Sequence, residues 1–301
     1  MLLKWISVRI FVVNAGELLY ASKKRRNTQM DEKEIRQRIQ AGRDFMKHYA
    51  ENDESYVTDQ YAGVTQPPLF KDPVATPVPL PQNYEDLVRT GDILEVINRR
   101  ESNRIYTEEN ITLLQLSYIL WCAQGVKGLR GKKYATLRTV PCGGARHEFE
   151  LYMCIKNVEG LKPGYYHYLP QSHSVECLRE EENLKDFLDA SLCGQTWSQK
   201  SSVVFYFSII PYRAEWRYGI YTHRIALVDA GYISENIYLA CTSIGLGSCA
   251  LGAIVTEVCD EAFGLDGNDE FIFLAHTVGT IQEADRQKEL DLYSFVHEND
   301  L

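Results

Sequence analysis

One segment constrains the fold more than any other: residues 201–210, SSVVFYFSII, are almost wholly apolar. A strand of this composition has no polar face to present to water, so it belongs in the centre of a sheet. Residues 148–156 and 165–169 are rich in aromatic and β-branched side chains and are joined by the turn sequence EGLKPG. This pattern predicts an antiparallel hairpin. A last strand is expected over 270–279.

Helical patterns lie between these strands without a regular strand–helix–strand alternation. A helix is expected over 92–100 with Asp92 as its N-cap, and a second opens at Ile111 or Thr112 and closes at Gly125. Further helices are expected over 183–192, over 221–243 as a long core helix, and over 256–265. The mixture predicts an α+β fold with a mostly antiparallel central sheet flanked by helices, rather than a doubly wound sheet.

The chain divides by composition into four parts. Residues 1–29 are expected to be an unstructured extension; their apolar stretch is too short to span a bilayer, and a secretory leader is the alternative. Residues 30–83 are expected to form a short amphipathic helix and an extended arm, because 66–81 holds six of the ten prolines. The folded body is expected over 84–285, followed by a tail over 286–301.

Charge and cysteine usage exclude several classes of function. The net charge is −9, which disfavours nucleic acid and anionic membranes as partners, so an anionic ligand requires a local basic cluster. The eight cysteines form neither a CxxC pair nor a zinc-ligand spacing. We therefore expect free thiols, a reducing cytoplasmic location and no metal.

Three short clusters offer residues suited to a ligand. The first is Arg100, Ser102 and Arg104, where guanidinium groups are suited to phosphate oxygens. The alternative is a solvated basic helix end. The second is the loop Pro141, Cys142, Gly143 and Gly144, flanked by Arg138, Arg146 and His147, where glycines permit close approach of backbone N–H groups. The alternative is an ordinary loop before a strand.

The third cluster follows the long helix and contains Leu246, Gly247, Ser248 and Cys249. It lacks the GxGxxG spacing after a strand, so a dinucleotide-binding Rossmann loop is not indicated.

The clusters, in their order and spacing, resemble the nitroreductase superfamily. RTVPCGGARH at 138–147 is similar to a recurrent string of the SagB-type dehydrogenase branch, whose relatives include azoline oxidases of peptide modification. NRRESNRIYTEENITLLQLSYILWCAQGV, NVEGLKPGYYHYLP and VDAGYISENIYLACTSIGLGSCALGA resemble the same branch. The resemblance extends over roughly residues 90–280.

The resemblance implies a nitroreductase-like, intertwined homodimer with FMN at the subunit interface. By this resemblance, Arg100, Ser102 and Arg104 contact the FMN phosphate and ribityl chain. Residues 141–144 approach the flavin ring, often from the partner subunit, with Gly143 or Gly144 donating an N–H near N5. Residues 246–249 lie beside the ring.

The resemblance also points to a candidate catalytic pair. Arg217 and Tyr218 stand where azoline oxidases have a Lys-Tyr pair that removes a proton. Arginine is not a useful base, so Tyr218 is the candidate proton donor or substrate clamp. Alternatively, Tyr218 is one more structural tyrosine. Arg286 and Lys288 are candidate basic partners of the phosphate.

The function implied is hydride transfer through FMN between NAD(P)H or an organic substrate and an acceptor. The substrate is expected to be a small molecule, such as a nitroaromatic or quinone. The alternatives are an azoline-type dehydrogenase acting in peptide modification and a non-catalytic flavin-binding partner protein.

Overall fold

The computed structural model describes residues 31–47 and 56–290, and the chain forms two units, Met1–Glu51 and Asn52–Leu301. In the first unit the described part is the helix α2 (Glu32–Met46), which begins at the N-cap Asp31 and buries none of its residues. The helix predicted for this region is therefore present. The expectations for residues 1–29 and for most of the C-terminal tail lie outside the described residues.

The second unit is built on a seven-stranded sheet in which every pair of neighbours is antiparallel. Its spatial order is β1 (Pro77–Pro79), β6 (Ser174–Glu180), β5 (Gly164–Leu169), β4 (Phe149–Ile155), β7 (Val203–Ile209), β9 (Phe271–Thr280) and β8 (Leu246–Leu251). The apolar strand β7 lies between β4 and β9 with all its residues buried, as predicted. A separate hairpin of β2 (Val126–Arg130) and β3 (Ala135–Arg138) was not predicted.

The five helices predicted for this unit are present, whereas α6 and α9 were not predicted. Thr112 caps α4 through a capping box with Gln115, and the helix ends at Gly125, as expected from the sequence. The helices are α3 (Ile93–Arg99), α4 (Leu113–Gln124), α5 (Lys185–Ser191), α6 (Tyr212–Tyr218), α7 (Thr222–Ser243), α8 (Thr256–Phe263) and α9 (Arg286–Leu290). Short 3-10 turns lie at Tyr84–Asp86, Gly143–Ala145, Thr196–Lys200, Gly219–Tyr221 and Glu283–Asp285.

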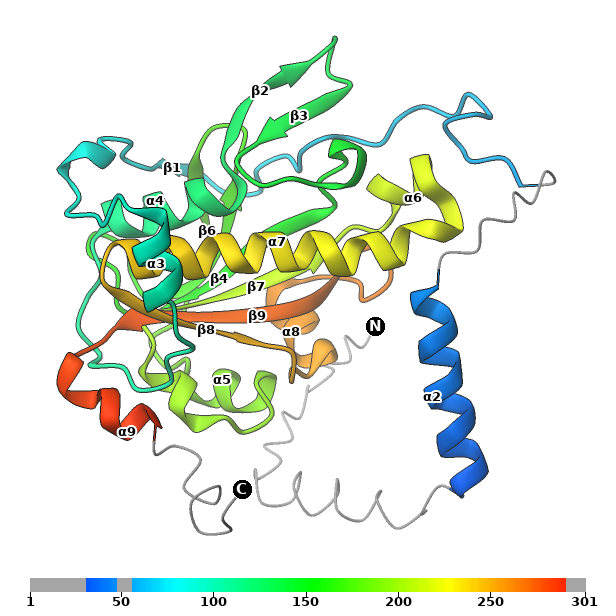
Figure 1. The fold of residues 1–301 in the computed structure, drawn as a ribbon. Coiled ribbons are helices and arrows are strands. Elements are labelled where there is room, and N and C mark those ends of the chain that lie inside the picture. The colour runs from blue at the N-terminus through cyan, green and yellow to red at the C-terminus, as the bar shows by residue number, and fades with distance from the viewer. Residues whose placement is uncertain (1–30, 48–55, 291–301) are drawn as a thin grey trace, which may run out of the picture. The chain divides into compact units, whose positions relative to one another are not determined.

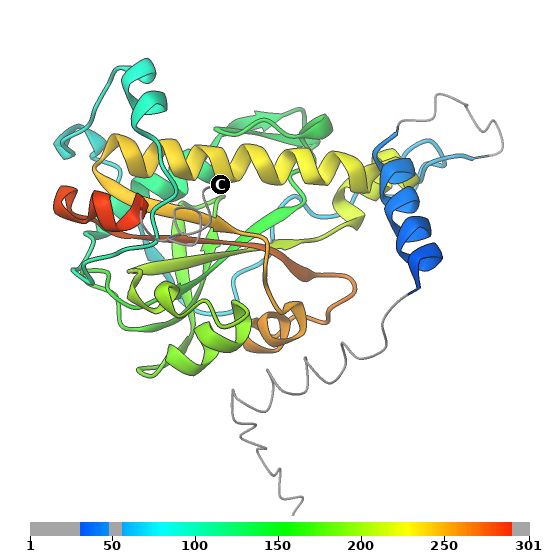
Figure 2. The ribbon, with the colours of Figure 1, turned by 60° about the horizontal axis from the view of Figure 1, so that its bottom comes forward.

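Helices cover both faces of the sheet (Figures 1 and 2). In both views α7 lies on one side of the strands, and α5 and α8 lie on the other. The alternation of β4 explains this, because Leu151 and Met153 join the core under α4 and α7, whereas Tyr152 and Cys154 join the core under α5 and α8. The α+β prediction of a mostly antiparallel sheet flanked by helices is confirmed.

The proline-rich arm, residues 66–81, is held by polar side chains of the sheet strands. Its only strand in the described residues is β1, which pairs with β6 at the sheet edge, where proline is tolerated. The Glu176 carboxylate accepts the backbone N–H groups of Val74 and Ala75, each at 2.7 Å. Lys71 binds the Tyr152 hydroxyl at 2.7 Å and pairs with Glu270. The arm is thus held by charge-assisted hydrogen bonds.

A buried ionic network lies beneath the arm. The two ring nitrogens of His167 face Glu176 at 2.9 Å and Glu150 at 3.4 Å, and Arg213 pairs with Glu150 at 2.5 Å. Burial lowers the pKa of His167, but the two carboxylates outweigh it and raise that pKa above the usual 6.5. Burial likewise opposes ionisation of Glu150, but Arg213 and His167 hold the Glu150 pKa well below its usual 4.5.

This network predicts a pH dependence of stability. Because the folded-state pKa of His167 is raised, its stabilisation is complete below about 6.5 and is lost as the pH rises through the folded value. We expect the free energy of unfolding, measured by urea denaturation, to fall above about pH 6.5 by at most ~1.4 kcal/mol per pH unit. His167→Gln should lack this fall, whereas His223→Gln, at a half-exposed side chain, should keep it. Parallel curves for native protein and His167→Gln would contradict the assignment.

Candidate functional site

The first cluster gathers around Tyr238 of α7. The Arg100 guanidinium lies over the Tyr238 ring, 5.3 Å from its centroid, and the Ser102 hydroxyl is 3.0 Å from the Tyr238 hydroxyl. Arg104 donates from its side chain to the Ser102 carbonyl at 3.2 Å. The predicted residues that follow α3 therefore share one location.

The third cluster meets the first at the same tyrosine. The Tyr238 hydroxyl accepts the N–H of Ala250 at 2.8 Å, and the Asn103 N–H donates to the Ser248 carbonyl at 2.8 Å. A Cβ at Gly247 would lie 2.9 Å from the Cβ of Asn103 and closer still to Ile281, so glycine permits this contact. The structure thus brings Arg100, Ser102 and Arg104 to the strand that carries Leu246, Gly247, Ser248 and Cys249.

An acidic residue near the C-terminus occupies the backbone donors of the first cluster. Glu289 of α9 accepts the N–H of Arg104 at 2.8 Å and that of Ile105 at 2.9 Å, and lies 3.8 Å from the Arg104 guanidinium. These donors therefore hold an anionic group in this structure. Nothing in the sequence pointed to Glu289, because the segment around it matches no ligand-binding motif.

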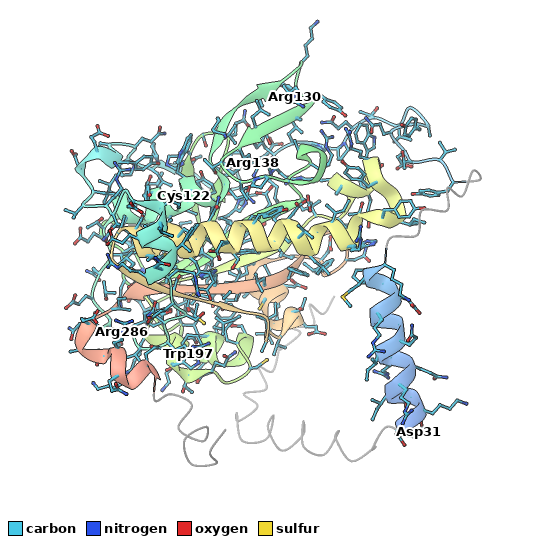
Figure 3. All side chains as sticks on the ribbon, viewed as in Figure 1. Asp31, Cys122, Arg130, Arg138, Trp197 and Arg286 are labelled. Carbon is cyan, nitrogen blue, oxygen red and sulfur yellow. The ribbon has the colours of Figure 1, made fainter. Side chains whose placement is uncertain are left out.

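The two predicted basic residues of α9 are paired with acids. Arg286 binds Glu101 at 3.0 Å, and Lys288 binds Asp285 at 2.6 Å. Figure 3 labels Arg286 on α9. A pocket of about 280 Å³ adjoins this point. Its charged lining residues are Arg99, Glu101, Glu283, Asp285, Arg286 and Glu289.

The second cluster lies against another stretch of α7. The Gly143 N–H donates to Asp229 at 2.9 Å, and the Cys142 thiol lies 3.3 Å from Glu148. The His147 N–H donates to the Cys142 sulfur at 3.0 Å, which closes the loop after Pro141. The Gly143 N–H, expected to approach a ligand, is engaged by Asp229 in this structure.

The predicted catalytic pair lies beside this loop. Gly144 has φ +57°, and a Cβ there would lie 3.0 Å from the Arg217 Nε and closer still to the Tyr218 hydroxyl. Glycine is required here by both the backbone angle and the contact. The Arg217 guanidinium lies 5.4 Å from the centroid of the Tyr218 ring.

A tyrosine missed by the sequence reasoning completes this group. Tyr134, in the turn between β2 and β3, accepts hydrogen bonds from Arg217 and, at 3.1 Å, from Gln60, and Arg146 lies 4.8 Å from its ring centroid. Burial raises the Tyr134 pKa, but the bond from Gln60 and the two guanidinium groups outweigh it and lower that pKa below the usual 10.0. The hairpin of β2 and β3 was not predicted from the sequence, so nothing indicated this residue.

The two groups are separate within one chain. Asp229 and Tyr238 are nine residues apart on α7, which corresponds to about 14 Å of helix. Arg138, next to the glycine loop in sequence, and Arg286 lie on opposite sides of α7 in Figure 3. The structure therefore unites the first and third predicted clusters and leaves the second apart.

Exposed apolar side chains lie on α3 and on the N-terminal half of α7. On α3 only Val96 is buried, whereas Ile93 and Leu94 are 63% and 64% exposed. The other exposed apolar residues on these two helices are Ile97, Leu227, Val228 and Tyr232. We call these six residues the α3/α7 surface. Within the described ranges, no helix has the length and apolarity needed to cross a membrane.

The position of Tyr238 yields a direct prediction. Tyr238→Phe removes the hydroxyl that joins Ser102 to Ala250, so we expect the free energy of unfolding to fall by about 1–2 kcal/mol. Urea denaturation measures this loss. Tyr232→Phe, on the exposed side of the same helix, is the matched control and should change stability little. Equal losses of unfolding free energy in the two variants would show that the hydrogen bonds of the Tyr238 hydroxyl do not stabilise the fold.

Comparisons with known proteins agree on one family. The Nitroreductase family model matches residues 97–280. A Methanocaldococcus jannaschii protein named after the nitroreductases is 33% identical over 159 residues, covering 53% of this chain and 77% of that protein. The microcin B17-processing protein McbC of Escherichia coli is 28% identical over 133 residues, covering 43% of this chain and 49% of McbC.

The fold is also found among solved structures. A chain of the E. coli microcin synthetase McbBCD complex superposes with a TM-score of 0.53 at 20% identity, covering 70% of this chain and 77% of that chain. This likeness concerns the fold alone. The family model spans more than half of the chain, and together with the M. jannaschii relative it shows that the chain belongs to the nitroreductase family.

Proposed function

We propose that the protein is an FMN-dependent oxidoreductase that transfers hydride between NAD(P)H or a small organic substrate and an acceptor. One observation carries the proposal: Arg100, Ser102 and Arg104 converge with residues 246–249 around Tyr238. Membership of the nitroreductase family supports it. The cysteine pattern of the sequence supports a reducing, cytoplasmic location.

The chemistry of the donors fits a phosphate. The backbone N–H groups of Arg104 and Ile105 already hold a carboxylate, and the Arg104 guanidinium lies 3.8 Å from it. The Arg100 guanidinium lies over the neighbouring Tyr238 ring. A phosphate carries more charge than a carboxylate and offers three acceptor oxygens, so the same donors bind it more strongly. Arg100 and Arg104 would hold the phosphate and Ser102 the ribityl chain, with Leu246, Gly247, Ser248 and Cys249 beside the ring.

We further propose that the site is completed in a homodimer. The glycine loop, Pro141 to Gly144, is remote from Tyr238 within one chain, so a second copy must supply its loop to the flavin ring. The α3/α7 surface offers apolar area for that contact. The two pockets at these places measure about 280 and 380 Å³, at the lower end for ligand sites, which also favours a composite site.

FMN, when bound, supplies the hydride chemistry. The residues of this chain position the substrate and handle its proton. Arg217 at the Tyr134 hydroxyl and Arg146 over the Tyr134 ring place positive charge here, which suits an anionic or electron-rich substrate group. Arg217 keeps its charge and serves as an orienting group. Tyr134 and Tyr218, the residue expected from the sequence, both contact Arg217 and are the candidate proton donors.

A second candidate is an azoline-type dehydrogenase of peptide modification. The similarity to McbC, which is named as a microcin-processing protein, favours it. The two functions differ in the electron donor, since the reductase consumes NAD(P)H and the dehydrogenase takes hydride from its substrate. A protein that binds FMN and turns over neither class would be the non-catalytic flavin-binding partner.

Phosphate binding by the first cluster predicts opposite effects of two charge changes. Arg100→Ala or Arg104→Ala should each weaken FMN binding by about 1–3 kcal/mol, the scale of a charge-assisted hydrogen bond. Glu289→Gln should strengthen it, because the variant removes a competing negative charge and keeps the side-chain shape. Quenching of flavin fluorescence on titration measures all three affinities.

The matched control for these variants is Arg130→Ala, at an exposed position of β2, which should bind FMN like the native protein. Weaker binding by Glu289→Gln would mean that Glu289 only supports the fold. A purified protein that is colourless and does not bind added FMN would contradict the proposal. NADH or NADPH oxidation with menadione or nitrofurazone then separates the reductase from the other two candidates.

The dimer predicts that flavin binding depends on the α3/α7 surface. Leu94→Glu combined with Val228→Glu should give monomers that bind FMN much more weakly, because burying these charges in an interface is unfavourable. Light scattering coupled to size exclusion reports the oligomeric state. Leu129→Glu, at an equally exposed apolar residue on β2, is the control and should remain dimeric. Monomers that retain full FMN affinity would contradict the composite site.

A further inference from the structure

Three potential metal ligands converge behind the glycine loop. The Cys142 sulfur and one carboxylate oxygen each of Glu148 and Asp229 all lie within 4.8 Å of one another. They come from three elements: Cys142 from the loop, Glu148 from the residue before β4, and Asp229 from α7. The fold therefore assembles them from residues with no ligand spacing in the sequence.

The two carboxylates are buried and incompletely satisfied. Glu148 is 1% exposed and Asp229 is 3% exposed. Among the described residues, the Glu148 Oε1 has no hydrogen-bond partner, while its Oε2 lies 3.3 Å from the Cys142 sulfur. An unpartnered buried carboxylate oxygen next to a second carboxylate is costly unless a cation or proton lies between them.

Two positive groups of the neighbourhood donate hydrogen bonds to other residues. The Arg138 guanidinium donates to Gln124 at 2.7 Å, and the Arg146 guanidinium donates to the Tyr134 carbonyl at 2.8 Å. These two hydrogen bonds are directed away from the carboxylates of the cluster.

We propose that Cys142, Glu148 and Asp229 bind a divalent cation of borderline hardness, with Zn²⁺ the best match. Zinc binds sulfur at about 2.3 Å and carboxylate oxygen at about 2.0–2.2 Å, so a tetrahedral site requires sulfur and oxygen about 3.5 Å apart. The distance between Cys142 Sγ and Glu148 Oε2 is 3.3 Å. Mg²⁺ and Ca²⁺ are poor matches, because they take oxygen ligands.

Three protein ligands leave a fourth position open. A pocket of about 380 Å³ is lined by Cys142 and Asp229 together with Arg224, Ile225, Val228 and Tyr232, and gives a water molecule access to that position. The cation would also tie the glycine loop to α7, since Asp229 already receives the Gly143 N–H. The site stands on these contacts alone and does not depend on flavin binding.

Cobalt provides the decisive probe, because it takes zinc sites and reports its ligands. The full chain, stripped with a chelator and dialysed, should bind one equivalent of Co²⁺ with a thiolate-to-cobalt charge-transfer band, and Zn²⁺ should displace it. Binding by the thiolate releases the Cys142 proton. Cys142→Ser should lose the band, and Glu148→Gln should weaken Zn²⁺ binding at least about tenfold, since loss of an outer-shell partner alone costs about that much.

The matched control is Cys193→Ser, which removes the exposed thiol and should keep both band and stoichiometry. Far-ultraviolet circular dichroism of each variant shows whether it is folded, and the spectrum of the native protein decides the question even where a variant fails to fold. Absence of the band from native protein, or its loss in Cys193→Ser but not in Cys142→Ser, would overturn the proposal. A Zn²⁺-dependent rise in melting temperature that Glu148→Gln abolishes would support it.

Discussion

Helix α7 is the element on which the other features of the second unit depend. It packs its buried side along the sheet and carries Asp229 and Tyr238 on two different turns. Tyr238 joins the loop after α3 to β8, and Asp229 holds the glycine loop through the Gly143 N–H. Asp229 and Tyr238 are about 14 Å apart along the helix axis, so the glycine loop and the loop after α3 are held at that separation.

This separation suggests a role for the exposed apolar residues of α3 and α7 in binding a second copy of the chain. A single chain places the residues proposed to hold the phosphate and the glycine loop in different places, and the two adjoining pockets are at the lower end for ligand sites. A second copy placed on the α3/α7 surface would bury apolar side chains that otherwise face water. Dimerisation and cofactor binding would then be linked, because the interface completes the site.

Individual acidic side chains of this protein are stabilised by neighbouring hydrogen-bond donors and positive charges. Around Glu150, burial alone would oppose ionisation, but Arg213 and His167 keep the carboxylate charged, and the network supports the arm that covers it. At Glu289 an acid occupies backbone donors beside Arg104. At Cys142, Glu148 and Asp229 two buried carboxylates lie together, and the Glu148 Oε1 has no hydrogen-bond partner among the described residues, which is why we propose an external cation there.

The sequence by itself determined most of the secondary structure of the second unit. Apolar β7, the hairpin of β4 and β5, the Asp92 and Thr112 caps and the length of α7 all follow from local patterns, since burial periodicity and capping depend on near neighbours. The pairing of Arg100, Ser102 and Arg104 with residues 246–249 was suggested by a family resemblance. The hairpin of β2 and β3, and with it Tyr134, was missed because its strands are short and partly exposed.

Only the tertiary structure decided which distant residues meet. The contacts that build the candidate sites join residues far apart in the chain. Tyr238, one of nineteen tyrosines, contacts Ser102, and Glu289 accepts the Arg104 N–H. Asp229 lies beside Cys142 and Glu148. Such contacts leave no periodic trace, because they depend on how helix and strand surfaces pack rather than on the preferences of either segment alone.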